Sequence, residues 1–378
     1  MSIRFEPTEL TAGELALQRE VREFLATELP RGSFEPGLGM AGRKDVGFSK
    51  KLAARGWVGM SLPTEYGGGD RSAVERFVVA EELLRWGAPI GHHWVADRQS
   101  GPLIARFGTT EQKARFLPAI CGAEIGFCIG MSEPDSGSDL ASVKTRATRT
   151  DGGWLVNGTK IWTTGAHEHA WMIALVRTSD EESRHAGLSQ LLVDMRAPGL
   201  TVNPIPFLDG STDFNEVVFD DVFVPDTDVV GQVGNGWAQV QSELAFERSG
   251  PDRWLSSYLV LEQLLREHAD VVDDALVELV GAATARWWGL RNLSLSVARA
   301  IDGGGSPVVE AALVKEMGTR FEQDVLEALR RLVAIEPWPD SPSQFERLLA
   351  NAILTGPAFS IRGGTNEILK TVAAKGLR

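Results

Sequence analysis

Hydrophobic and polar positions alternate with two different periods along this 378-residue chain, and the period changes twice. In the first third, apolar residues recur every three to four positions, which predicts helices separated by breaks rich in glycine and proline. The predicted helices cover residues 8–29, 48–55, 72–86, 99–107 and 111–121. The chain is therefore expected to begin with a mostly helical region.

From about Glu124 to Gln232 the pattern changes to short β-branched and aromatic runs separated by turn residues. Such runs predict antiparallel strands, with turns at sites such as Asn157-Gly158. Examples of the predicted strands are residues 154–156, 171–176, 191–194 and 217–219. A compact β barrel or sandwich is the fold that this pattern favours.

Helical periodicity returns after Gly236. The predicted helices are residues 237–248, 253–269, 273–301, 308–333 and 344–355, and a closing segment, 361–376, begins with a glycine pair. We therefore predict a multi-domain α+β protein with three domains. They are an N-terminal helical domain (1–124), a middle β domain (125–232) and a C-terminal helical domain (233–378).

Composition narrows the classes of function. Hydrophobic residues at 43% and charged residues at 24% are typical of a soluble globular protein. The net charge of −13 argues against nucleic acid or an anionic membrane surface as a partner. The two cysteines exclude a disulfide framework and favour a reducing cytoplasm. The N-terminal residues show no signal pattern, and no apolar run is long enough to cross a bilayer.

Two stretches carry residues suited to a polar, planar, phosphate-bearing cofactor. Residues 131–140 offer small hydroxyls, glycine and backbone N–H groups in a run too broken for a helix. Residues 157–165 form a β-type run that contains the flat ring of Trp162. Loops of serine, glycine and aspartate also occur without any ligand, so composition alone leaves both readings open.

Glu247 is the most informative single residue. Val240, Leu244 and Glu247 fall at i, i+4 and i+7 of a predicted helix and so share one apolar stripe. Loss of hydration there would raise the pKa of the carboxyl group and suit it to act as a base. The alternative is an ion pair with Arg248, which follows it directly.

The closing stretch Arg362-Gly-Gly-Thr-Asn-Glu367 is a loop that opens a helix. Its backbone donors suit an anion or a carbonyl oxygen, and the alternative is a simple capping turn. The pairs His92-His93 and His167/His169 lack carboxylates or cysteines at ligand spacing, so no metal site is predicted.

Together these stretches resemble the acyl-CoA dehydrogenase family nearly end to end. The motifs that carry the resemblance are Met131-Ser-Glu-Pro-Asp-Ser-Gly-Ser-Asp139, Asn157-Gly-Thr-Lys-Ile-Trp-Thr-Thr164, Phe219-Asp-Asp-Val-Phe-Val-Pro225 and Gly363-Gly-Thr-Asn-Glu367. The resemblance implies a helical domain, a β-barrel domain and a C-terminal four-helix bundle. It also implies FAD, an acyl-CoA substrate and an electron-transferring flavoprotein as oxidant.

The resemblance assigns roles residue by residue. Met131 and Ser132 would meet the isoalloxazine edge, Ser138 the pyrophosphate and the pantetheine side of the substrate, Trp162 and Thr164 the flavin's other side, and Thr365 and Glu367 the rest of FAD. Many family members carry the base at the position of Gly363. Others carry it on the helix that opens the last domain, where Glu247 stands. Arg248 would then contact substrate, and the Gly363 N–H would bind the thioester carbonyl.

Two elements of homotetrameric members are missing from the sequence. We find no Arg-x-x-Phe-Gly element and no Gln-x-x-Gly-Gly-x-Gly element, each of which contacts a neighbour's FAD in those members. The sequence is most similar to catalytic subunits of actinobacterial α2β2 dehydrogenases that shorten steroid side chains. A non-identical partner subunit and a bulky steroid or polycyclic acyl-CoA are therefore expected, with a trans-2-enoyl-CoA product. The alternatives are a non-catalytic partner subunit, or a flavin oxidase or monooxygenase on the same fold.

Overall fold

A computed structural model describes residues 3–38, 43–267, 273–333 and 338–376, apart from the side chains of residues 243–247. The chain forms two compact units. The sheet unit comprises Lys44–Arg71 and Gly91–Glu243, and the helical unit comprises Met1–Arg43, Ser72–Ile90 and Leu244–Arg378. None of the described helices is long and apolar enough to cross a membrane.

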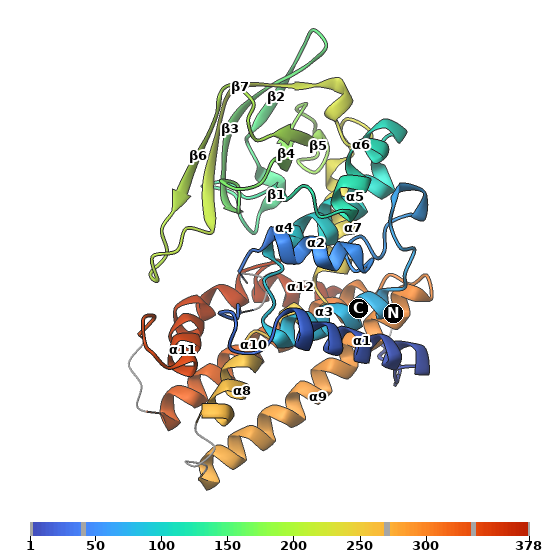
Figure 1. Ribbon diagram of the computed structural model, residues 1–378. Coiled ribbons are helices and arrows are strands. Elements are labelled where there is room, and N and C mark those ends of the chain that lie inside the picture. The colour runs from blue at the N-terminus through green and yellow to red at the C-terminus, as the bar shows by residue number, and fades with distance from the viewer. Residues whose placement is uncertain (1–2, 39–42, 268–272, 334–337, 377–378) are drawn as a thin grey trace. The chain divides into compact units, whose positions relative to one another are not determined.

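The helical unit contains seven α-helices among its described residues (Figure 1). They are α1 (Ala12–Glu28), α3 (Ala73–Trp86), α8 (Tyr258–Glu267), α9 (Asp274–Asp302), α10 (Val308–Leu332), α11 (Gln344–Thr355) and α12 (Asn366–Gly376), with 3-10 turns η6 (Pro251–Arg253) and η7 (Gly356–Ser360). Reciprocal capping boxes begin α1 and α3, through Thr11 with Glu14 and through Ser72 with Glu75. Helix α10 packs against α9, α12 and η7. It therefore lies next to the segment that joins η7 to α12.

The sheet unit is built on one seven-stranded sheet. Its strands are β1 (Phe127–Gly130), β2 (Arg146–Thr150), β3 (Gly153–Thr164), β4 (Trp171–Arg177), β5 (Leu188–Asp194), β6 (Leu200–Ile205) and β7 (Phe214–Pro225). Its helices are α2 (Val46–Ala54), α4 (Gly91–Val95), α5 (Gly101–Phe107), α6 (Thr110–Cys121) and most of α7 (Gly236–Glu247), with short turns η2 (Thr64–Tyr66), η3 (Ala96–Ser100), η4 (Leu140–Ser142) and η5 (Asp226–Asp228). The predicted order of helical, β and helical regions is confirmed. The exact domain boundaries stay a prediction.

Strand β4 explains why part of the sheet reads as a continuous apolar run. Met172 and Ala174 belong to one buried cluster inside the sheet, whereas Trp171 and Ile173 belong to a second cluster that includes residues of α5 and α6. Alternate side chains of this strand are therefore buried on opposite faces, and both sets must be apolar.

Two details of the predicted β region are wrong. The strands are not all antiparallel, because β1 pairs with β4 in parallel. Asn157-Gly158 is not a turn between strands but lies inside β3, at a register shift opposite β7. The Asn157 side chain bonds both the backbone and the carboxylate of Asp221 across that shift. Gly158 has φ +142° and lies so close to Thr145 that no Cβ would fit, so the glycine serves close packing and not a hairpin.

Two predicted helix limits also change. The helix expected from residue 99 is preceded by α4 and the π-helical turn η3. The helix expected over 253–269 begins at Tyr258, because the Ser256 N–H donates to the buried carboxylate of Glu322 instead of continuing a helix. The closing helix begins at Asn366, after Gly363 and Gly364 with φ of +66° and +89°, so the predicted loop that opens a helix is present.

Candidate functional site

The sheet unit brings the two predicted cofactor stretches side by side. The Ile161 N–H donates to the Ser132 carbonyl oxygen at 2.9 Å. The Lys160 ammonium donates to the Met131 carbonyl oxygen at 3.1 Å. The backbone carbonyl groups of Met131 and Ser132 thus join the segment after β1 to the C-terminal part of β3. Both side chains remain partly exposed, so they are available to a ligand.

A buried ion pair supports this junction. The Lys160 ammonium lies 2.8 Å from a carboxylate oxygen of Glu133, and both side chains are almost fully buried. The carboxylate also accepts the N–H groups of Lys144 and Thr145, at 2.6 and 2.9 Å. Every part of the pair therefore has a partner, as a buried charge requires.

The pKa values follow from this setting. Burial alone raises the pKa of the Glu133 carboxyl group, but the Lys160 charge and the donated hydrogen bonds outweigh it and hold that pKa below its usual value. Burial lowers the pKa of Lys160 to about 8, against the attraction of Glu133. The pair is thus ionised at neutral pH.

Trp162 owes its position to a bulge. Between Lys160 and Thr163 strand β3 advances three residues while β7 advances two. Trp162 takes φ +60°, which is rare for a bulky side chain, and its side chain is 55% exposed. Its ring meets that of Phe214 edge to face, with centroids 6.2 Å apart. The bulge therefore turns a flat aromatic ring outward, next to the segment that contains Ser132.

Thr164 and Ser138, the other predicted cofactor residues of this unit, lie in a strand and in a loop respectively. Thr164 pairs with Phe214 in the β3–β7 ladder and is partly exposed. Ser138 is exposed in the loop after β1. Neighbouring bonds shape that loop, since the Ser136 hydroxyl donates to the Asp139 carbonyl and Arg184 bonds the Asp139 carboxylate. Ser138 is therefore presented by a braced loop.

The helical unit contains the second part of the predicted site, the 362–367 turn. Gly363 and Gly364 both have positive φ, which side chains with a Cβ rarely adopt. A Cβ at Gly363 would lie 2.8 Å from the guanidinium of Arg253, and one at Gly364 would lie 3.4 Å from that of Arg248. A side chain at residue 363 would therefore be strained by the positive φ and would require the Arg253 guanidinium to shift.

The turn ends on α12, where Thr365 and Glu367 begin the helix. The Thr365 hydroxyl accepts the Ile368 N–H at 3.4 Å. The exposed Glu367 carboxyl has a pKa below its usual value, because its own N–H and the Thr365 hydroxyl donate to it. Both residues therefore cap the start of α12.

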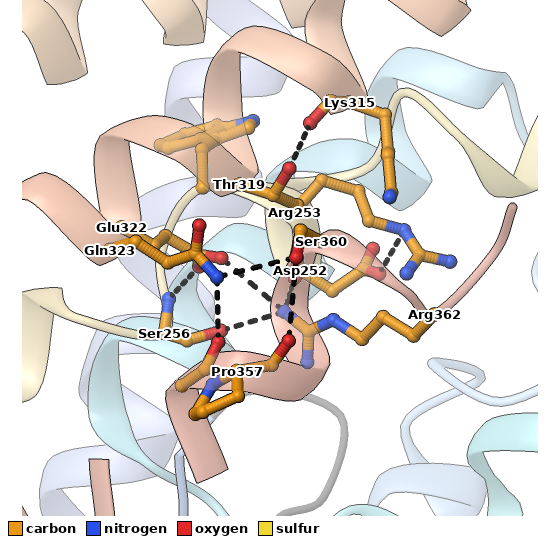
Figure 2. Close-up of polar contacts among 12 residues, drawn as sticks. Asp252, Arg253, Ser256, Lys315, Thr319, Glu322, Gln323, Pro357, Ser360 and Arg362 are labelled. Carbon is orange, nitrogen blue, oxygen red and sulfur yellow. Dashed lines mark hydrogen bonds and ion pairs between the residues drawn. The ribbon is translucent and has the colours of Figure 1, made fainter. Parts of the chain in front are cut away.

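Cationic side chains dominate the surroundings of the turn. Arg248, Arg253, Lys315 and Arg362 approach it, and Figure 2 shows the last three with their partners. Arg253 is fully buried and bonds Asp252 at 3.0 Å. Lys315 donates to the Gly364 carbonyl oxygen at 2.8 Å. Among the residues that the structure describes, the carboxylates of Asp252 and Glu322 and that of Glu367 in the turn itself accompany these cations.

Glu247 ends α7, and its side chain lies outside the described part of the structure. Its neighbour Arg248 is buried and, as given above, lies against Gly364. The predicted substrate residues Arg248 and Gly363 are thus brought to the same turn. No group of three or more potential metal ligands occurs among the described residues.

Sequence reasoning missed the buried charged residues Glu133, Lys160, Arg253 and Lys315. For Lys315 a signal existed. It falls four residues after Ala311 and eleven before Leu326, on the buried face of α10, the same kind of position that drew attention to Glu247. For the other three, nothing in the local pattern indicates burial.

Comparison with known proteins gives consistent matches. Residues 11–124 match the family model for the acyl-CoA dehydrogenase N-terminal domain, and residues 128–222 match that for the middle domain. Acyl-CoA dehydrogenase IpdE1 of Mycobacterium tuberculosis is 34% identical over 94% of this chain and 95% of its own length. Acyl-CoA dehydrogenase FadE34 of the same organism is 35% identical over 86% of this chain, which spans only 45% of that protein.

Solved structures agree over the whole chain. The Tcur3481-Tcur3483 steroid ACAD gives a TM-score of 0.86 at 28% identity, covering 100% of this chain and 99% of that one. The ChsE4-ChsE5 complex from Mycobacterium tuberculosis gives 0.82 at 26% identity, with 99% of each chain covered.

Proposed function

The chain belongs to the acyl-CoA dehydrogenase family of FAD-dependent oxidoreductases, and we propose that it oxidises a bulky acyl-CoA to the trans-2-enoyl-CoA with Glu247 as the base. The family's general activity is the dehydrogenation of acyl-CoA thioesters. The observation that carries the choice of Glu247 is the contact of its neighbour Arg248 with Gly364. The base would stand one residue from a side chain packed on the turn that binds the thioester.

FAD fits the residues of both parts of the predicted site. The exposed Trp162 ring and the partly exposed Met131, Ser132 and Thr164 offer a flat surface and polar groups to the flavin. Ser138, Thr365 and Glu367 would contact the rest of the cofactor. When bound, FAD supplies the hydride acceptor.

Residues of the chain remove the proton and stabilise the charge that develops on the substrate. Glu247 removes the α-proton, and charge then grows on the thioester oxygen. Donors fixed at that oxygen lower the barrier, because they are oriented before the reaction starts. The Gly363 N–H is the proposed donor, and the cations Arg248 and Arg253 beside the glycine pair add electrostatic stabilisation.

Glu247→Gln tests the assignment of the base. We expect turnover to fall by roughly 10²–10⁴-fold while bound flavin and its absorbance are retained. The matched control is Glu23→Gln, which changes an exposed carboxyl group on α1 and should leave turnover unchanged. Retained turnover in Glu247→Gln would exclude it as the base, and rapid peroxide formation without an electron acceptor would indicate an oxidase.

The proposed substrate is a steroid or polycyclic side-chain acyl-CoA, and the proposed oxidant is an electron-transferring flavoprotein. Support comes from the 28% identical steroid ACAD that matches over the full chain. The specificity constant kcat/KM should be higher for a CoA thioester of a steroid side chain than for octanoyl-CoA. The reverse order would contradict this substrate class.

We also infer a non-identical partner subunit in an α2β2 assembly. The names of both solved structures join two polypeptides, and the sequence elements of a self-sufficient tetramer are missing. Native mass spectrometry of the chain alone and co-expressed with neighbouring gene products tests this. A homotetramer with one FAD per chain and full turnover would contradict it.

A further inference from the structure

Helix α10 carries three polar residues on its buried face. Lys315, Thr319 and Glu322 follow one another at intervals of four and three residues, so they share one side of the helix. All three have no exposed surface. Burial of two charged groups costs free energy unless each is paired and hydrogen-bonded. Their partners therefore indicate what the helix is built to hold.

Lys315 and Thr319 hold the downstream end of the 362–367 turn. The Lys315 ammonium donates to the Gly364 carbonyl oxygen at 2.8 Å and to the Asn366 side-chain oxygen at 3.2 Å. The Thr319 hydroxyl lies 3.1 Å from the same Asn366 oxygen and 2.9 Å from the Lys315 carbonyl oxygen. One ammonium thus ties the second glycine to the first residue of α12.

Glu322 holds the upstream end, as Figure 2 shows. Its carboxylate accepts the Ser256 N–H at 2.6 Å and lies 3.4 Å from the guanidinium of Arg362. Arg362 also donates to the Asp252 carbonyl and the Ser256 hydroxyl, each at 3.1 Å. The glycine pair therefore lies between two attachments that both start from α10.

The attachment at Gly364 has a geometric consequence. The peptide bond between Gly364 and Thr365 is trans, so its carbonyl and its N–H point in opposite directions. Fixing the carbonyl on Lys315 turns the Thr365 N–H away from α10. Two successive glycines would otherwise leave this peptide plane free to rotate. A hydrogen bond from a charged donor is strong enough to select one orientation.

We propose that Lys315 is a positioning residue, whose ammonium fixes the Gly364 carbonyl and so orients the Thr365 N–H within the 362–367 turn, which is proposed to contact cofactor and substrate. This inference rests on the function proposed above for that turn. Lys315 touches neither ligand and acts through the backbone. Thr319 supports it by holding the shared oxygen of Asn366.

Lys315→Met in the full chain, co-expressed with its partner where the partner is needed for solubility, is the main test. We expect amide hydrogen exchange to rise about tenfold or more within residues 362–367, and FAD to bind about tenfold more weakly. The value of kcat should fall more than KM changes, because the turn is misoriented and not removed. A loss of fold alone would instead raise exchange throughout the helical unit.

Two further variants keep the test decisive. Lys370→Met removes an exposed lysine from α12, whose nearest carboxylate is 3.8 Å away, and should change none of these quantities. Thr319→Val keeps Lys315 and removes only its support, so it should give a smaller change of the same kind even if Lys315→Met fails to fold.

The outcomes separate this inference from the proposed function. The positioning role would be overturned if Lys315→Met showed the same amide exchange, FAD affinity and kcat as the wild type. If only Thr319→Val folds, the same result in that variant would overturn it. A wild-type chain that binds FAD but oxidises no acyl-CoA would overturn the proposed function. In that case the exchange and FAD-binding measurements still decide whether Lys315 positions the turn.

Discussion

The segment around Ser132 and the 362–367 turn are held in place by different means. In the sheet unit, the Ile161 N–H at the β3 bulge bonds the Ser132 carbonyl directly, and one buried ion pair, Lys160 with Glu133, braces the contact. In the helical unit, the side chains of Lys315 and Glu322 on α10 hold the turn, Lys315 at the Gly364 carbonyl and Glu322 at the Arg362 guanidinium. The conformation near Ser132 is therefore fixed mainly by a backbone hydrogen bond from the bulged strand, whereas the conformation of the glycine turn is fixed by side chains of another helix.

This difference predicts which single changes do most damage. Lys160→Met is expected to have the largest effect on stability, about 3–5 kcal/mol of unfolding free energy, because it leaves the Glu133 carboxylate buried without its cation. Urea denaturation followed by circular dichroism measures it. Lys144→Met removes an exposed lysine that pairs with an exposed aspartate and should leave the midpoint nearly unchanged. Equal midpoints for the two variants would show that the sheet does not depend on the ion pair.

Gly363→Ala tests how much the conformation of the turn contributes to the unfolding free energy. A positive φ costs a residue with a Cβ about 1–2 kcal/mol, and here the added methyl group also meets the buried guanidinium of Arg253. Gly210→Ala is the matched control, since Gly210 has φ +81° with open space around its Cβ position. The Gly363 variant should lose more unfolding free energy than the control and should also lose turnover. If the two variants are equally stable, Arg253 does not restrict the turn.

A pH series sharpens the role of the ion pair. The folded-state pKa of Glu133 lies below its ordinary value of 4.5, so this group stabilises the fold above pH 4.5 and the contribution is lost as the pH falls through the lower, folded-state value. The difference in unfolding free energy between wild type and Glu133→Gln should therefore be larger at pH 7 than at pH 3.5. A difference that is constant over this range would mean that the Glu133 charge does not contribute.

Trp162→Leu should have the smallest effect on stability. Its side chain is exposed, so the unfolding free energy should change by no more than about 0.5 kcal/mol. FAD affinity should nevertheless fall about twofold to tenfold, because ring stacking is lost. Fluorescence titration with FAD measures this. Unchanged affinity would separate Trp162 from the cofactor, although the surrounding strand would still be described correctly.

Much of the fold could be predicted because it depends on local patterns. The change of hydrophobic period near residues 124 and 232 gave the helical, β and helical order correctly. The Asn157-Gly158 turn was wrong, because its partner across the register shift, Asp221, is distant in sequence. The helix expected over 253–269 begins late for the same reason, since the Ser256 N–H finds Glu322.

The candidate site divides in the same way. Met131, Ser132, Trp162 and Gly363 belong to contiguous motifs, and from these motifs the sequence by itself predicted that they contact cofactor and substrate. Only the tertiary structure decided that Lys160, Glu133, Arg253 and Lys315 are buried beside them. The free energy of a charged side chain depends on which distant groups replace its water. Apart from the helical spacing that marks Lys315, no local pattern contains that information, because burial is a property of the packed chain.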